Sequence, residues 1–196
     1  MQTGDWIASP RSRKDIEALA VSWLDHFGFF HHYVANLPGI LEHDMPELVP
    51  GFILKIVEDC MLPDAYASTK FDPLEITVRE SVYNGMIKGE PRSRFTIAHE
   101  IGHALMHSTD RTLQRASVPV AARKLNRSYS AEWQADCFAS SFLMPEHIAR
   151  TFDNPQELSQ NCQVSLAAAQ IRLSELGIWP KKKPIPDLDF LKKYKN

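Results

Sequence analysis

The amino-acid sequence predicts an α+β fold, in which a small mixed sheet with helices is followed by a helical carboxy-terminal segment. Three observations predict it. Apolar residues recur at every second position in FILKIVED and EITVRE, which is typical of strands. They recur at helical spacing in RFTIAHEIGHALMH and SAEWQADCFASSFLMP. Beyond residue 145, a helical pattern continues in LSQNCQVSLAAAQIRLSEL.

Length and composition indicate one main folded unit. The chain has 196 residues and a formal net charge of -2, which is neither the strongly basic balance of a nucleic-acid binder nor a disordered composition. The amino terminus lacks the apolar stretch of a signal peptide, and no run is long enough to span a membrane, so we expect a cytoplasmic protein. The cysteines are odd in number and form no CxxC pair, so we expect reduced thiols at Cys60, Cys137 and Cys162.

The amino-terminal half alternates predicted helix, loop and strand. A helix should begin after Ser12 and end at Gly28. Its buried face should consist of Ile16, Leu19, Ala20, Trp23, Leu24 and Phe27. A stretch interrupted by prolines, LPGILEHDMPELVPG, should separate this helix from the two strands. The inward residues of the strands should be Phe52, Leu54, Ile56, Ile76 and Val78. Two glycines and a proline predict a turn or loop for SVYNGMIKGEPR.

A helix over residues 93–107 should carry two different faces. The apolar face consists of Ile97, Ile101, Ala104 and Leu105. On the opposite side lie His99, His103 and His107. Two histidines at i and i+4 can both reach one ion at about 2.0–2.1 Å, the distance that zinc requires. Glu100 completes an H-E-x-x-H pattern and should take a proton from water at the metal. The alternative is that these histidines are structural.

The third metal ligand must come from outside this helix. Three ligands along one straight helix span about 12 Å at 1.5 Å per residue, so His107 should not bind the same ion as the other two. The helix predicted over residues 130–145, capped by Ser130, carries Glu132 and Asp136 one turn apart among small residues. We expect Glu132 to be the carboxylate ligand and Asp136 to accept the free N–H of a metal-bound imidazole. A solvated acidic face is the alternative for this pair.

The motifs together resemble the ImmA/IrrE family of zinc-dependent metallopeptidases. The resemblance rests on RFTIAHEIGHALMH, EWQADCFASSFLMP and VSLAAAQIRLSELGI, and it spans roughly residues 12–179. It implies a zincin-like metallopeptidase unit, which we place at residues 1–145, and a helix-turn-helix-like segment, which we place at 146–196. It also implies zinc, with manganese as an alternative. The implied ligands are His99, His103 and Glu132, and the implied catalytic base is Glu100.

The resemblance further implies a substrate. Characterised members of the family cut helix-turn-helix repressors of the XRE type, which releases genes for mobile-element transfer or stress response. We therefore expect site-specific cleavage of such a transcriptional repressor or of an antitoxin. A substrate strand should bond to the VRESVYNG region, and the candidate oxyanion or substrate donors are Tyr83, Tyr129 and His107. The alternative is a regulatory module that binds and sequesters the repressor without cutting it.

Direct DNA binding by the carboxy-terminal segment is not expected. The turn position usually occupied by glycine is Gln163, and the following helix offers only Arg172 as a base or phosphate contact. We interpret the segment as a helical pair for packing or for docking the repressor. The basic tail, residues 181–196, is typical of a solvated chain end.

Overall fold

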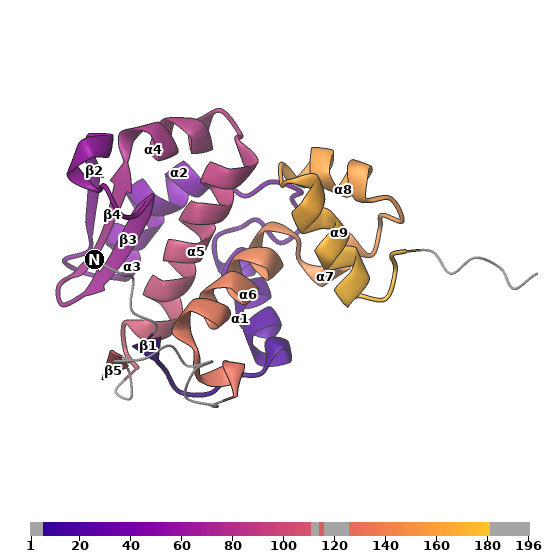
Figure 1. Ribbon diagram of the computed structural model, residues 1–196, viewed down its shortest axis with the longest axis horizontal. Coiled ribbons are helices and arrows are strands. Elements are labelled where there is room, and N and C mark those ends of the chain that lie inside the picture. Colours follow the sequence, from indigo (N-terminus) through magenta and orange to yellow (C-terminus); the bar gives the residue numbers. More distant parts are fainter. Residues whose placement is uncertain (1–5, 111–113, 116–125, 181–196) are drawn as a thin grey trace, which may run out of the picture.

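The computed structural model describes residues 6–110, 114–115 and 126–180, so the basic tail lies outside the described residues. Figure 1 shows α5 (Pro91–His107) crossing the middle of the molecule between the sheet and the other long helices. The helix predicted over residues 93–107 is thereby confirmed, and it begins slightly earlier than predicted. No helix in the described part of the chain is both long enough and apolar enough to cross a bilayer.

The main sheet has three strands in the order β2-β4-β3. The strand β2 (Ile53–Val57) runs parallel to β4 (Leu74–Arg79), and β3 (Ala67–Phe71) runs antiparallel to β4. Both predicted strands are confirmed, and the alternating residues Ile76 and Val78 are fully buried as predicted. The sheet is therefore mixed, with β4 in its centre.

Two predictions about this sheet are wrong. Ile56 is 45% exposed rather than inward, because it lies near the end of the edge strand β2. The VRESVYNG region cannot receive a substrate strand, because its strand residues belong to β4, which already has a neighbour on each side. The free edges belong to β2 and β3. The sequence did not predict β3, because ASTKF has no alternating apolar residues.

The amino-terminal half is more helical than the sequence indicates. The predicted first helix is confirmed as α1 (Arg13–His26), where Ser12 and Asp15 form a capping box. Two segments before α5 are largely helical: the proline-interrupted stretch, and SVYNGMIKGEPR, whose predicted turn or loop is wrong over residues 81–87. In the second of them, Gly85 makes room for α5: a Cβ there would lie 2.4 Å from Ser93 Oγ. The helical segments in question are α2 (Leu37–Gly39), the π-helical η1 (Ile40–Asp44), α3 (Met45–Leu48) and α4 (Glu80–Ile87).

A close contact between α5 and α6 (Ala131–Leu143) lies next to the predicted metal ligands. Ser130 caps α6 by accepting a hydrogen bond from the Trp133 N–H, as predicted. Gly102 of α5 faces Phe138 of α6, and a Cβ at Gly102 would lie 2.9 Å from the Phe138 ring. The missing side chain therefore allows the two helices to approach. The remaining small elements lie elsewhere in the described chain. The strand β1 (Trp6–Ile7) pairs with β5 (Gln114–Arg115), and the 3-10 turns are η2 (Asp59–Met61) and η4 (Arg127–Tyr129).

The carboxy-terminal segment consists of short helices that share the core of the rest. Gln163, between α8 and α9, has the left-handed φ of 52° that glycine usually adopts at such a turn. Leu158, Val164 and Leu173 belong to the same buried cluster as the core residues of α1, α5 and α6. The described residues on both sides of position 145 therefore pack together, and the domain boundary stays a prediction. The helices are α7 (Glu146–Ala149), α8 (Pro155–Cys162) and α9 (Leu166–Glu175).

Arg172, the one base or phosphate contact considered for α9, points into the protein. It is 1% exposed, and its guanidinium donates to both carboxylate oxygens of Glu17, at 2.6 and 2.7 Å, and to the Met144 carbonyl at 2.8 Å. This side chain therefore holds α9 against α1, and it cannot contact nucleic acid without breaking a buried ion pair.

Candidate metal site

Three side chains from two helices meet where α5 and α6 lie side by side. His99 and His103 stand one turn apart on α5, and their Nε2 atoms are 3.0 Å apart. From α6, Glu132 places Oε2 3.3 Å from His99 Nε2 and Oε1 3.5 Å from His103 Nε2. The structure thus brings the three predicted ligand residues together.

The spacing of these donor atoms fits a tetrahedral metal ion. Metal–ligand bonds of about 2.0–2.1 Å correspond to donor-to-donor separations of about 3.4 Å, close to the three separations observed. Two imidazoles and one carboxylate are also the ligand set of a class of catalytic zinc sites, in which substrate or water takes the fourth position. Both the geometry and the chemistry of the donors therefore suit zinc.

Asp136 lies on the other side of the His99 ring. Its Oδ1 is 2.9 Å from His99 Nδ1, the nitrogen that does not face Glu132. Burial opposes a charge on His99, but hydrogen bonds to Asp136 and Glu132 outweigh it and raise the pKa of His99 to about 10. Burial likewise opposes ionisation of Glu132, but His103 and His99 outweigh it and hold the pKa of Glu132 well below its usual range. The carboxylates of Asp136 and Glu132 therefore favour a positive charge on the group that lies between them.

Glu100 is held beside the cluster by a residue that the sequence did not identify. The Glu100 side chain is buried, and its Oε2 accepts a 2.6 Å hydrogen bond from Thr69 Oγ1 on the edge strand β3. Glu100 does not belong to the group of converging donors. This placement suits a base rather than a ligand. Thr69 lies 31 residues before Glu100 on an unpredicted strand, so no local sequence signal links the two.

The three candidate oxyanion donors lie in different surroundings. The Tyr83 hydroxyl donates to Glu42 in η1, which gives this tyrosine a structural contact. His107 is 1% exposed behind the His103 ring, and burial lowers the pKa of His107 to about 3, so its position argues against contact with substrate. Tyr129 is 37% exposed directly before α6, and its role stays a prediction.

Comparisons with known proteins agree with this site. The IrrE N-terminal-like domain family matches residues 79–174, a range that contains the H-E-x-x-H helix and Glu132. The radiation response metalloprotease IrrE of Deinococcus radiodurans is 30% identical over 151 residues, which cover 73% of this chain and 43% of that protein.

A solved structure supports the fold alone. A Mycobacterium tuberculosis transcriptional regulator superposes with a TM-score of 0.56 at 20% identity, over 88% of this chain and 50% of that chain. This chain therefore spans half or less of the length of either relative. The family match, the IrrE relative and the motifs together show that the chain belongs to the ImmA/IrrE family.

Proposed function

We propose that the protein is a metal-dependent endopeptidase. The observation that carries the proposal is the convergence of His99, His103 and Glu132 next to a buried glutamate, Glu100, that Thr69 holds in place. The IrrE relative, whose name describes it as a metalloprotease, supports the same activity. We infer zinc as the metal because of the ligand set, with manganese as the alternative.

Each residue of the site would have a separate role. Zinc bound there would supply a Lewis acid that lowers the pKa of water to about 7 and polarises the scissile carbonyl. His99, His103 and Glu132 would hold the ion, and Asp136 would fix the orientation of the His99 ring. Glu100 accepts a proton from the attacking water and passes it to the leaving nitrogen, which contributes about 10²–10⁴-fold to the rate.

The substrate that we infer is a helix-turn-helix repressor of the XRE type or an antitoxin, whose cleavage would regulate transcription under stress. This step rests on the ImmA/IrrE resemblance. An extended segment of the repressor would add to the free edge of β3, which packs on α5 and holds Thr69. The zincin-like unit would cut this segment, while the helix-turn-helix-like pair α8 and α9 would dock the folded part of the repressor.

The test compares wild type with Glu100→Gln. Both proteins, loaded with zinc, are incubated with a purified XRE-type repressor encoded next to the gene, and fragments are identified by mass spectrometry. Wild type should cut the repressor at one site, and Glu100→Gln should cut it at least 10²-fold more slowly because the base is lost. Native mass spectrometry should find one metal ion in both. The control is Glu47→Gln, the same chemical change at an exposed position on α3, which should leave the rate unchanged.

The non-proteolytic alternative predicts a different result. A sequestering module would reduce DNA binding by the repressor equally with wild type and Glu100→Gln, and it would release no fragments. That outcome would overturn the endopeptidase proposal. Equal cleavage of an unfolded protein such as casein would instead contradict the inferred specificity for one repressor site.

A further inference from the structure

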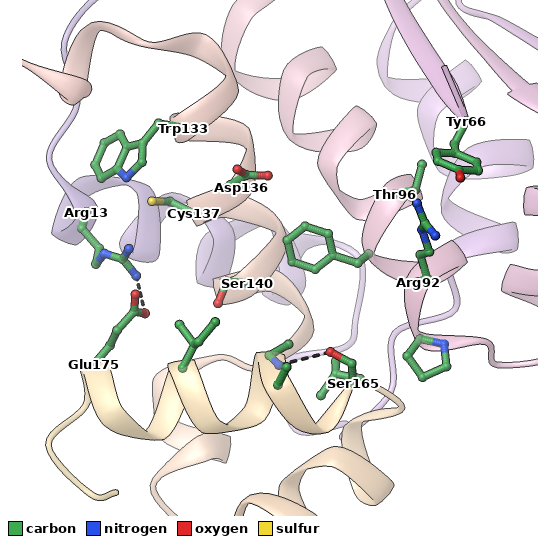
Figure 2. A pocket seen from close by; sticks show the side chains of 16 residues that line it. Arg13, Tyr66, Arg92, Thr96, Trp133, Asp136, Cys137, Ser140, Ser165 and Glu175 are labelled. Atoms are coloured by element: carbon green, nitrogen blue, oxygen red, sulfur yellow. Dashed lines mark hydrogen bonds and ion pairs between the residues drawn. The ribbon is translucent and has the colours of Figure 1, made fainter. Parts of the chain in front are cut away.

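A groove of about 780 Å³ separates α9 from the two helices of the metal site. Figure 2 shows α9 along one side, with residues of α5 and α6 on the other. Its lining is mainly apolar and includes Phe95, Trp133, Val164, Ala168 and Ile171. Ile171, in the middle of α9, is 59% exposed and adds to this apolar lining, and contiguous apolar surface of this kind is typical of a binding groove.

Two lining residues of the groove adjoin the candidate metal site. Asp136, whose carboxylate bonds to His99, is one of its lining residues. Thr96 is another, and it lies one turn before His99 and Glu100 on α5. A polypeptide held in this groove would therefore continue directly to the residues that we propose cut it.

The charges in the groove are unequal at its two ends. Near Trp133, Arg13 is paired with Glu175 across the groove, and the Asp136 carboxylate adds one negative charge, so no unpaired cation lies at this end among the described residues. At the other end, the Arg92 guanidinium lies 4.3 Å from the Tyr66 ring centroid and forms no ion pair with any residue that the structure describes. An adjoining pocket adds Lys88, together with the single acid Glu90. This end therefore carries a net positive charge.

We infer that the groove is a specificity site for the substrate, and that it binds an extended segment with an apolar side chain and an acidic side chain. The apolar side chain would cover Ile171, and the acidic one would pair with Arg92. Arg92 lies about two helical turns, roughly 10 Å, from His99 along α5. An extended peptide rises about 3.3 Å per residue, which places the acidic residue about three positions from the cut bond. This inference rests on the proposed function.

The test uses a library of random 12-residue peptides displayed for binding to the zinc-loaded, inactive Glu100→Gln protein. Peptides that combine acidic and apolar residues should be enriched. Adding Arg92→Glu should reverse the charge preference, and a fluorescent peptide selected by the parent should lose at least tenfold in affinity. Arg92 is exposed in the first turn of α5, where a glutamate is also favourable, so the variant should fold. Adding Ile171→Asp should remove the apolar preference.

The matched control is Lys14→Glu, an equal charge change at an exposed position on α1 that does not line the groove. It should select the same peptides as the parent. Identical selection by the parent and the Arg92→Glu protein, or no selection at all, would overturn the inference. If charge-selected peptides bind but wild type never cuts them, the endopeptidase proposal is wrong, while the groove is still a peptide-binding site. If the repressor is cut at the same rate with and without Arg92, the groove is not a specificity site, while the endopeptidase proposal is unaffected.

Discussion

Two groups of facing ionisable side chains, the Glu17–Arg172 pair and the candidate metal site, differ in how completely their hydrogen-bonding groups are paired. In the pair of Glu17 and Arg172, both carboxylate oxygens accept from the guanidinium, while the Ser141 hydroxyl and the Glu146 N–H donate to them as well. In the candidate metal site, two imidazole nitrogens and a carboxylate face one another at 3.0–3.5 Å. Both imidazole nitrogens and the carboxylate are potential electron-pair donors, so these side chains have few protons with which to form hydrogen bonds among themselves.

This difference in hydrogen bonding distinguishes a structural ion pair, Glu17 and Arg172, from a candidate binding site. Glu17 and Arg172 join α1 to α9 and need no further partner. The donors of the candidate metal site converge as the ligands of one cation would, and Asp136 adds negative charge behind them. Ligand-like residue types alone would not distinguish the two groups, whereas their hydrogen bonds do.

The largest expected effect is on the structural pair. Arg172→Met should lower the free energy of unfolding by up to about 3 kcal/mol, because it leaves the Glu17 carboxylate, only 15% exposed, without its cation. Urea unfolding of the metal-free protein measures this loss. The double variant Glu17→Gln/Arg172→Met should recover much of it, since no charge is then buried. A loss below about 1 kcal/mol in the single variant would show that the pair does not hold α9 in place.

The convergence of His99, His103 and Glu132 could be predicted from the sequence, whereas the contacts around these residues could not. The i and i+4 spacing of the α5 histidines and the acidic pair on α6 are local signals, and helix geometry alone brings each set to one face. Thr69 and the Glu17–Arg172 pair have no such signal, since 31 and 155 residues separate the partners. Long-range pairing depends on the tertiary fold, which the local pattern does not contain.

The wrong prediction of a turn or loop over residues 81–87 has a related cause. Gly85 was interpreted as a turn glycine, but it lies inside α4, where its missing side chain makes room for Ser93 and Glu90. Glycine is typical both of turns and of close helix contacts, and only the packing partner distinguishes these roles. Gly102 has the same structural role within α5, since a Cβ there would lie 2.9 Å from the Phe138 ring.

A smaller effect is expected at Asp136. Asp136→Asn should weaken zinc binding about 10–100-fold, because the amide no longer accepts a charge-assisted hydrogen bond from His99. Competition with a chromophoric chelator measures the change in affinity. Asp25→Asn, the same substitution at an exposed position on α1, should leave the affinity unchanged. Equal affinity in the Asp136→Asn protein would mean that this carboxylate belongs to a solvated acidic face.

The smallest expected effect is the pH dependence of the metal-free protein, which should come from two histidines of the same helix. The pKa of His99 is raised to about 10 in the folded state, so the folded protein keeps a proton that the unfolded chain loses above about pH 6.5. Stability should therefore fall as the pH rises from 6.5 to 8.5. The pKa of His107 is lowered to about 3, so between pH 6.5 and 4.5 the unfolded chain gains a proton that the folded protein does not. Stability should therefore also fall as the pH decreases.

Urea unfolding between pH 4.5 and 8.5 should thus give a maximum near pH 6.5, with each limb no steeper than about 1.4 kcal/mol per pH unit. The alkaline limb should be shallower than this limit, because the Asp136 and Glu132 side chains are 61% and 41% exposed and water screens them. His99→Gln should flatten the alkaline limb and His107→Gln the acid limb, whatever each variant does to stability at pH 6.5. Saturating zinc should reverse the slope of the alkaline limb, because the metal requires His99 without its proton. An alkaline slope that zinc leaves unchanged would mean that His99 does not bind the ion, and the metal site would then have to be assigned to other residues.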